Sequence, residues 1–218
     1  MEVTAIRLMC LVHCKLCLNT LTQGCSVRTD FQILDTPNTG LCAPELILEQ
    51  KPDVLMLDLD LEGDVQHLAE QIRRLTSEIH VAIIGTKWSD IVLIRSLKAG
   101  VEGLLLKNES ANTLFEHLRQ IAHGNTRISA DLSERLRYDE RRNTFSLATD
   151  SPLTTFTGQQ LEILRLLACG DSLKMVASKL KLSRKSIDGH KYRIMRKLGI
   201  NDRVLLSRLA IREGLIQP

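Results

Sequence analysis

Residues 156–203 read FTGQQLEILRLLACGDSLKMVASKLKLSRKSIDGHKYRIMRKLGINDR, a run of short helix signals with no strand pattern between them. Thr157, followed three residues later by Gln160, forms a capping box that starts a first helix. A stripe of leucines follows, and Gly170 stands where a helix would end. This part of the chain is therefore expected to be all-α.

Two further helices are expected on either side of a very short turn. Ser172 can cap a second helix that runs to Leu180, and Ser183 can cap a third that runs to Leu198. Only two residues separate these helices, which is typical of a helix-turn-helix unit. A fourth helix is expected from Arg203 to Glu213, so the sequence predicts four helices within a domain of residues 153–218.

A helical wheel divides the third helix into an apolar side and a basic side. Ile187 and Ile194 lie on the apolar side, together with His190 and Leu198. The opposite side carries Lys185, Gly189, Tyr192, Arg193 and Arg196. Cations with one aromatic side chain suit contacts to phosphates and base edges, so we expect this side to bind DNA, with Lys191 and Lys197 as further contacts. Gly189 costs helix propensity but would allow close approach of a DNA backbone.

The charge of the chain is segregated. Residues 151–218 carry 13 Lys and Arg against five Asp and Glu, a balance of +8, whereas residues 1–150 have a balance of −5. A basic C-terminal domain favours an anionic partner such as nucleic acid.

The C-terminal stretch resembles the LuxR-type helix-turn-helix of NarL-like response regulators. The positions that match the family are Thr157, Glu162, Ala177, Leu182, Ser183, His190, Lys197, Leu198 and Gly199. The resemblance implies a third helix in the major groove of double-stranded DNA and a homodimer that forms through the fourth helix. Asp188 and Gly189 depart from the lysine and apolar residue that are frequent there, which affects base preference.

Residues 1–124 alternate between apolar runs and amphipathic segments. The expected strands are Ile6–Val12, Phe31–Leu34, Val54–Leu57, Val81–Ile84 and Gly103–Leu106. The expected helices are Cys14–Gln23, Ala43–Gln50, Val65–Leu75, Asp90–Ala99 and Ser110–His123. Strands that are apolar throughout are covered on both faces, so this pattern predicts an α/β domain of five βα units with a doubly wound parallel sheet. The polar residues 125–152 are interpreted as a linker, in which 131–142 could form a charged helix.

The N-terminal part resembles, more loosely, the receiver domain of response regulators. KPDVLMLDLDLEG, residues 51–63, matches the third strand and places Asp58 at the phosphoacceptor position. AGVEGLLLK, residues 99–107, matches the fifth strand with Lys107. The resemblance implies a pocket for Mg²⁺ and a phosphoryl group at the carboxyl ends of the strands.

Several elements of that pocket are replaced. The family's acidic pair falls on Val12 and His13, and its hydroxyl residue on Gly85, although Thr86 is adjacent. The aromatic switch position is Leu104. Mg²⁺ prefers oxygen ligands, so we expect no Mg²⁺ cofactor and no metal site. Asp58 is expected to pair with Lys107, and His13 could join them. Asp60 or Glu62 could alternatively restore a metal site.

Cys14 and Cys17 form a Cys-x-x-Cys motif where the first strand meets the first helix. Such a pair can be a redox dithiol or can hold a soft metal, but it can equally be two small residues of a helix.

Three functions follow from these patterns. The first is a sequence-specific DNA-binding transcription regulator that works without Mg²⁺-dependent phosphorylation. The second is a conventional response regulator phosphorylated at Asp58, and the third is a thiol or metal sensor that uses Cys14 and Cys17. No catalytic residues are expected. Without a long apolar run or a signal peptide, the chain is expected to be cytoplasmic, away from membranes, with a sensor kinase or another regulatory protein as a possible partner.

Overall fold

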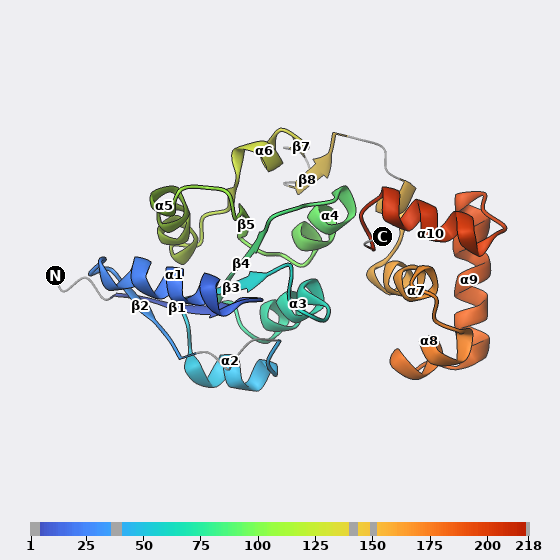
Figure 1. Ribbon diagram of the computed structural model, residues 1–218, viewed down its shortest axis with the longest axis horizontal. Coiled ribbons are helices and arrows are strands. Elements are labelled where there is room, and N and C mark those ends of the chain that lie inside the picture. Colours follow the sequence, from blue (N-terminus) through green and yellow to red (C-terminus); the bar gives the residue numbers. More distant parts are fainter. Residues whose placement is uncertain (1–4, 36–40, 140–143, 149–151, 217–218) are drawn as a thin grey trace. The chain divides into compact units, whose positions relative to one another are not determined.

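The computed structural model describes residues 5–35, 41–139, 144–148 and 152–216, which form two compact units. One unit is built on a parallel sheet and the other consists of helices (Figure 1). No helix within the described residues is long and apolar enough to cross a membrane.

The first unit contains a six-stranded parallel sheet with the strand order β2-β1-β3-β4-β5-β6. Its strands are β1 (Ile6–Leu11), β2 (Phe31–Ile33), β3 (Val54–Asp58), β4 (His80–Gly85), β5 (Gly103–Leu106) and β6 (Arg127–Ile128). The connecting helices are α1 (Lys15–Ser26), α2 (Pro44–Gln50), α3 (Val65–Leu75), α4 (Asp90–Lys98) and α5 (Ala111–Ala122). The doubly wound α/β fold and all five predicted strands and helices are confirmed.

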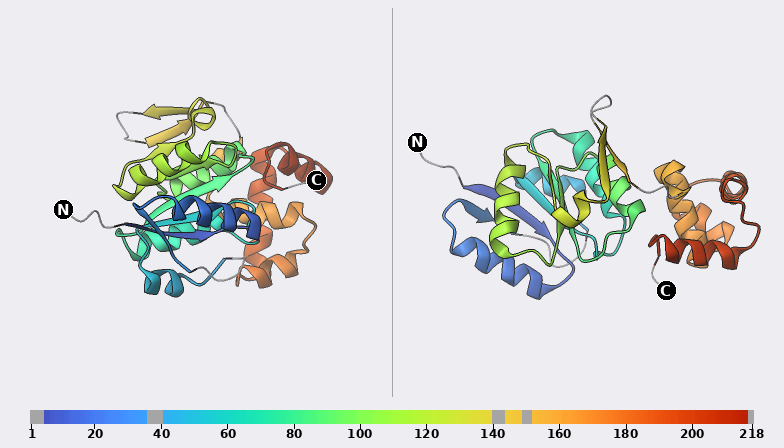
Figure 2. Two further views of the ribbon diagram at one scale, coloured as in Figure 1. Left: turned by 60° about the vertical axis from the view of Figure 1, so that its left-hand side comes forward. Right: turned by 90° about the horizontal axis from the view of Figure 1, so that it is seen from above.

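Alternation along the strands assigns side chains to the two faces of the sheet. Cys10, Met56 and Leu105 pack with residues of α1 and α5 in one buried cluster. Their strand neighbours Leu11 and Leu57 are buried but point to the opposite face. Helices therefore cover the sheet on both sides (Figures 1 and 2).

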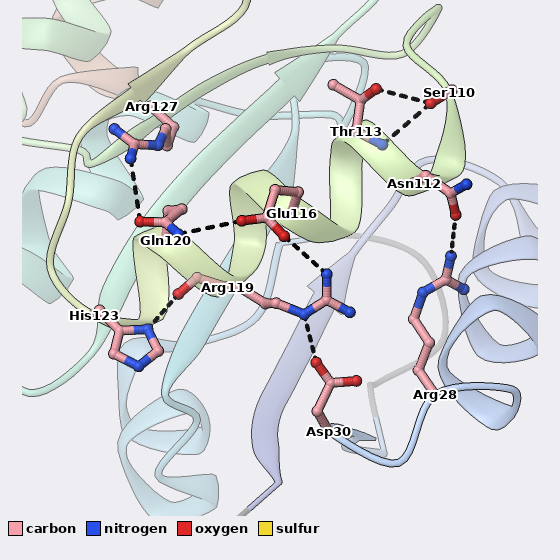
Figure 3. Close-up of polar contacts among 10 residues, drawn as sticks. All are labelled: Arg28, Asp30, Ser110, Asn112, Thr113, Glu116, Arg119, Gln120, His123 and Arg127. Carbon is pink, nitrogen blue, oxygen red and sulfur yellow. Dashed lines mark hydrogen bonds and ion pairs between the residues drawn. The ribbon is translucent and has the colours of Figure 1, made fainter.

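Polar contacts attach α5 to the loop between α1 and β2 (Figure 3). Arg119 of α5 donates to the carboxylates of Asp30 and Glu116, and Arg28 donates to Asn112. Ser110 caps the helix, because its hydroxyl accepts from the amide of Thr113. This network holds α5 against the segment that leads into β2.

The segment after α5 differs from the prediction. It contains β6, the short helix α6 (Ala130–Ser133) and the strands β7 (Leu136–Asp139) and β8 (Thr144–Leu147), which form a separate two-stranded sheet. The expected helix over 131–142 is wrong beyond residue 133, and residues 140–143 lie outside the described part. β6 joins the sheet because Ser129 anchors it: its amide donates to Leu104 and its buried hydroxyl accepts from the amide of Leu106.

The second unit contains the turn η1 (Pro152–Thr155) and four helices, as predicted. They are α7 (Gly158–Ala168), α8 (Leu173–Lys179), α9 (Arg184–Leu198) and α10 (Arg203–Arg212). Its core holds Leu164, Val176, Ile187, Ile194 and Leu206, each with an exposed fraction of at most 1%. The core orients α9 by burying one of its sides.

Candidate nucleic-acid interface and acceptor pocket

The start of each helix in the second unit is set by its capping residue. The capping box between Thr157 and Gln160 is formed in both directions. Ser172 and Ser183 cap α8 and α9 through their hydroxyl groups, which accept amide hydrogen bonds. Lys181 has a positive φ of 53° in the two-helix turn, and Gly199 ends α9 in the left-handed conformation. These local signals fix both ends of the helix that carries the basic residues.

One side of α9 is exposed and basic. We call Lys185, Gly189, Tyr192, Arg193 and Arg196 the basic face, and all five are exposed. Lys191 is half-buried at its margin. The guanidinium carbon of Arg196 lies 5.6 Å from the ring centroid of Tyr192, so the aromatic ring and the charge form one surface. The basic face lies opposite the buried Ile187 and Ile194, as the wheel indicates.

Lys197 occupies a different setting from the basic face. Its ammonium donates to the carbonyl of Thr155 at 3.0 Å and lies 4.9 Å from the centroid of Phe156. The side chain therefore ties η1 to α9 while its terminal group stays exposed. Arg184, which the wheel analysis did not single out, is also exposed in the first turn of α9 and adds a cation next to Lys185.

His190 lies on the inner margin of α9. Burial lowers the pKa of His190, and the charge of Arg193 acts in the same direction. The neutral imidazole is therefore favoured at the position where α9 meets its core.

α10 is fastened to α7 by its first turns. The guanidinium of Arg203 donates to the carbonyls of Leu167 and Asp171, and the hydroxyl of Ser207 donates to Ala168. The bonds to Leu167 and Ala168 satisfy carbonyls at the end of α7 that have no partner within that helix, and the bond to Asp171 reaches the loop that follows it. The other side of α10 exposes Val204, Leu205 and Ile211, with exposed fractions of 58%, 44% and 38%.

In the first unit, the residues at the carboxyl ends of four strands form what we call the acceptor pocket: Val12, His13, Asp58, Gly85 and Lys107. Asp58 ends β3 with no exposed surface. Its carboxylate accepts hydrogen bonds from the amides of His13 (3.1 Å) and Asp60 (3.0 Å). The ammonium of Lys107 lies 2.6 Å from Oδ1 of Asp58.

Lys107 has a second partner, Asp60, which was expected from the sequence only as a possible metal ligand. Its ammonium also lies 2.8 Å from Oδ2 of Asp60. Burial works against the charge of Lys107, but the hydrogen bonds that the lysine donates to Asp58 and Asp60 outweigh it and raise the pKa of the lysine. A carboxylate two residues after the strand was the available signal for this contact.

The remaining pocket residues supply no oxygen ligand from their side chains. Val12 is buried in the sheet core, and the side chain of His13 is exposed, so His13 joins the pocket through its backbone. A Cβ atom on Gly85 would lie 2.6 Å from Cδ1 of Leu59, and the neighbouring Thr86 is exposed. The donor set at the place of the acidic pair, an isopropyl group and an imidazole, does not fit Mg²⁺.

Comparisons with known proteins show which families and folds this chain is similar to. Residues 154–210 match the family described as bacterial regulatory proteins, luxR family. The oxygen regulatory protein NreC of Staphylococcus aureus strain MRSA252 is 28% identical over 194 residues, which cover 87% of this chain and 89% of NreC.

Two solved structures have a similar fold. RcsB from Salmonella enterica serovar Typhimurium, solved bound to promoter rprA in the presence of phosphomimetic BeF3-, has a TM-score of 0.69 at 19% identity, covering 94% of this chain and 98% of RcsB. The response regulator ChrA of a heme-sensing two-component system has a TM-score of 0.50 at 21% identity, covering 97% of this chain and 99% of ChrA. The chain thus has the receiver-plus-helix-turn-helix arrangement of these proteins.

Proposed function

We propose that this chain, which joins a receiver-like domain to a LuxR-type helix-turn-helix domain, is a sequence-specific DNA-binding transcription regulator. The observation that carries the proposal is the basic face of α9. Its cations are exposed on a helix whose other side is fixed in a core, which is the presentation that groove contacts need. The proposed activity is binding rather than catalysis.

The name of one related protein and the DNA bound to another support this proposal. NreC is named an oxygen regulatory protein, and RcsB was solved on promoter DNA. For this chain, Lys185 and Arg196 are proposed to contact the duplex from the centre of the basic face. Lys191, at the margin of the basic face, and Lys197, which ties η1 to α9, are proposed to contact phosphates, which position the protein without reading bases.

A homodimer is proposed to form on DNA through α10. Val204, Leu205 and Ile211 expose apolar side chains on that helix, whereas Arg203 and Ser207 fasten it to α7. A two-fold dimer would place two copies of α9 on half-sites about one helical turn apart. A cytoplasmic location and a regulatory protein partner, such as a sensor kinase, belong to the same proposal.

Selection of bound duplexes from a random pool tests binding, half-site spacing and dimerisation together. The full chain is then titrated with a selected duplex, and fluorescence anisotropy reports affinity at several salt concentrations. Lys185→Ala and Arg196→Ala should each weaken binding about tenfold and reduce the salt dependence. Arg74→Ala removes the same charge from an exposed position of α3 and should leave affinity unchanged. Affinity that does not fall with salt, or equal effects of all three variants, would contradict the proposal.

The acceptor pocket is proposed to work without Mg²⁺-dependent phosphorylation of Asp58. The ammonium of Lys107 already pairs with both Asp58 and Asp60, and the positions of the acidic pair offer no carboxylate. A metal ion supplies several kcal/mol of charge neutralisation in phosphoryl transfer, about the amount this pocket would lack. The alternative is a conventional response regulator whose Asp58 is the phosphoacceptor.

Intact-mass spectrometry after incubation with acetyl phosphate separates the two readings. Wild-type protein with Mg²⁺, wild-type protein with a chelator and Asp58→Asn should each keep the mass of its own unmodified sequence. A Mg²⁺-dependent mass increase that Asp58→Asn abolishes would establish the alternative and overturn the proposal for the pocket.

A further inference from the structure

Cys14 and Cys17 lie beside the acceptor pocket, at the junction of β1 and α1. Their Sγ atoms are 3.0 Å apart, and both side chains are partly exposed. Cys14 is the N-cap of α1, and its sulfur accepts from the amide of Cys17 at 3.4 Å. The two sulfurs are therefore close enough to bond after a small movement, and solvent can reach them.

The surroundings of the two thiols distinguish them. Hydrogen bonds from the side chain and then the amide of Cys17 lower the pKa of Cys14, and the charge of Lys107 acts in the same direction. The pKa of Cys17 is raised, first by its hydrogen bond to Cys14 and then by burial. A helix N-terminus favours a thiolate at the cap position. Cys14 is thus the nucleophile of the pair and Cys17 the resolving thiol.

The other cysteines lack this combination. Cys10 and Cys25 are buried, and burial raises the pKa of each thiol. Burial also raises the pKa of Cys42. Cys169 is exposed in the second unit and serves as an internal reference for unassisted reactivity.

We propose that Cys14 and Cys17 are a redox-active pair that a low-molecular-weight disulfide, such as glutathione disulfide, converts reversibly into an intramolecular disulfide. The Cys14 thiolate attacks one sulfur of glutathione disulfide, forms a mixed disulfide and releases one glutathione thiolate. Cys17 loses its proton to that thiolate, attacks Sγ of Cys14 and releases the second glutathione thiolate, which takes up the proton that Cys14 had lost. Two cysteine thiols are oxidised, and one glutathione disulfide is reduced to two glutathione molecules.

The position of the pair connects it to the acceptor pocket. His13, whose amide donates to the carboxylate of Asp58, directly precedes Cys14. Lys107 acts electrostatically on both thiols and binds Asp58 directly. A disulfide between Cys14 and Cys17 therefore forms at the edge of the pocket where an acidic pair would have stood.

Redox titration of the full chain tests the proposal independently of DNA binding. The protein is equilibrated at a series of glutathione to glutathione disulfide ratios, free thiols are blocked with N-ethylmaleimide, and tryptic peptides are sequenced by mass spectrometry. Trypsin cuts after Lys15, so the disulfide joins peptides 8–15 and 16–28. Fragmentation distinguishes Cys14 from Cys10, and Cys17 from Cys25. The expected result is a Cys14–Cys17 link with the same midpoint from the oxidised and the reduced side.

Matched variants identify the roles of the two thiols, and circular dichroism checks that each is folded. Cys17→Ser should accumulate glutathione on Cys14 about tenfold faster than on Cys169, because it has no resolving thiol. Cys14→Ser should react at Cys17 no faster than at Cys169. Cys169→Ser should leave the midpoint unchanged. Wild-type protein that keeps both thiols free at every ratio, or that forms only intermolecular disulfides, would overturn the proposal.

Discussion

The ammonium group of Lys107 spans both carboxylate oxygens of Asp58, at 2.6 Å from Oδ1 and 2.7 Å from Oδ2. Asp58 has no exposed surface, whereas 21% of the Lys107 side chain is exposed. Loss of the ion pair should therefore cost more when Asp58 is left alone than when Lys107 is left alone, since a buried charge without a partner is costly.

Lys107→Met should lower the free energy of unfolding of the first unit by about 3 kcal/mol, because Asp58 keeps only its two amide donors. Asp58→Asn should cost about 1 kcal/mol, since Lys107 retains Asp60 and the asparagine oxygen still accepts from an amide. Urea unfolding followed by circular dichroism measures both. Equal losses would show that Asp58 is not held mainly by the lysine.

Gly85→Thr places a hydroxyl side chain where the receiver family has one. The new Cβ would lie 2.6 Å from Cδ1 of Leu59, so we expect the variant to lose about 1–3 kcal/mol through overpacking. Leu59→Ala removes the nearest atom, Cδ1, together with Cγ, and leaves only Cβ at 3.1 Å. The double variant should therefore be more stable than the sum of the two single changes by about 1 kcal/mol. If the losses of unfolding free energy are additive in the same urea assay, the predicted clash between residues 85 and 59 is wrong.

Much of the fold was predictable because local signals agree with burial. Val65–Leu75 and Gly103–Leu106 begin and end at the predicted residues, since apolar periodicity and capping point to the same bounds. β6 was missed because two residues carry no periodic pattern, and its pairing depends on Ser129, which lies apart from β5 in the sequence. The two-stranded sheet of β7 and β8 was not predicted, because the charged residues of this segment also suit an exposed helix.

The candidate site likewise has one part that could be predicted from the sequence and one part that could not. The basic face is a property of one helix, so a wheel describes it from the sequence alone. The contact of Lys107 with Asp60 and the 3.0 Å approach of Cys14 to Cys17 depend on how loops after different strands are placed, which no spacing rule supplies.

His190→Gln should change how stability depends on pH. Burial and Arg193 lower the folded-state pKa of His190 below its ordinary value of 6.5, so the unfolded chain binds the proton more readily. The stability that this imidazole provides is present above about pH 6.5 and is lost as pH falls through the lower folded-state value. Between pH 7.5 and 5.5 the thermal midpoint of wild-type protein should therefore fall further than that of the variant. The control is His67→Gln at an exposed position of α3, which shows the effect of the same substitution at an unrelated site. Parallel curves for wild type and His190→Gln would contradict the assignment.

Gly189→Ala should change stability and DNA affinity in opposite directions. A Cβ atom on Gly189 would meet nothing within 4 Å, so no packing within the chain requires glycine in the interior of α9. Alanine has the better helix propensity, and the second unit should gain about 1 kcal/mol of unfolding free energy. If the duplex backbone approaches α9 at Gly189, the added methyl group should nevertheless weaken binding about tenfold. Gly158→Ala, also with open space at its Cβ but at the start of α7, should leave affinity unchanged. Urea unfolding and anisotropy titration on the same preparations measure both effects. A Gly189→Ala protein that is stabilised and binds with wild-type affinity would show that the duplex does not approach this turn of the helix.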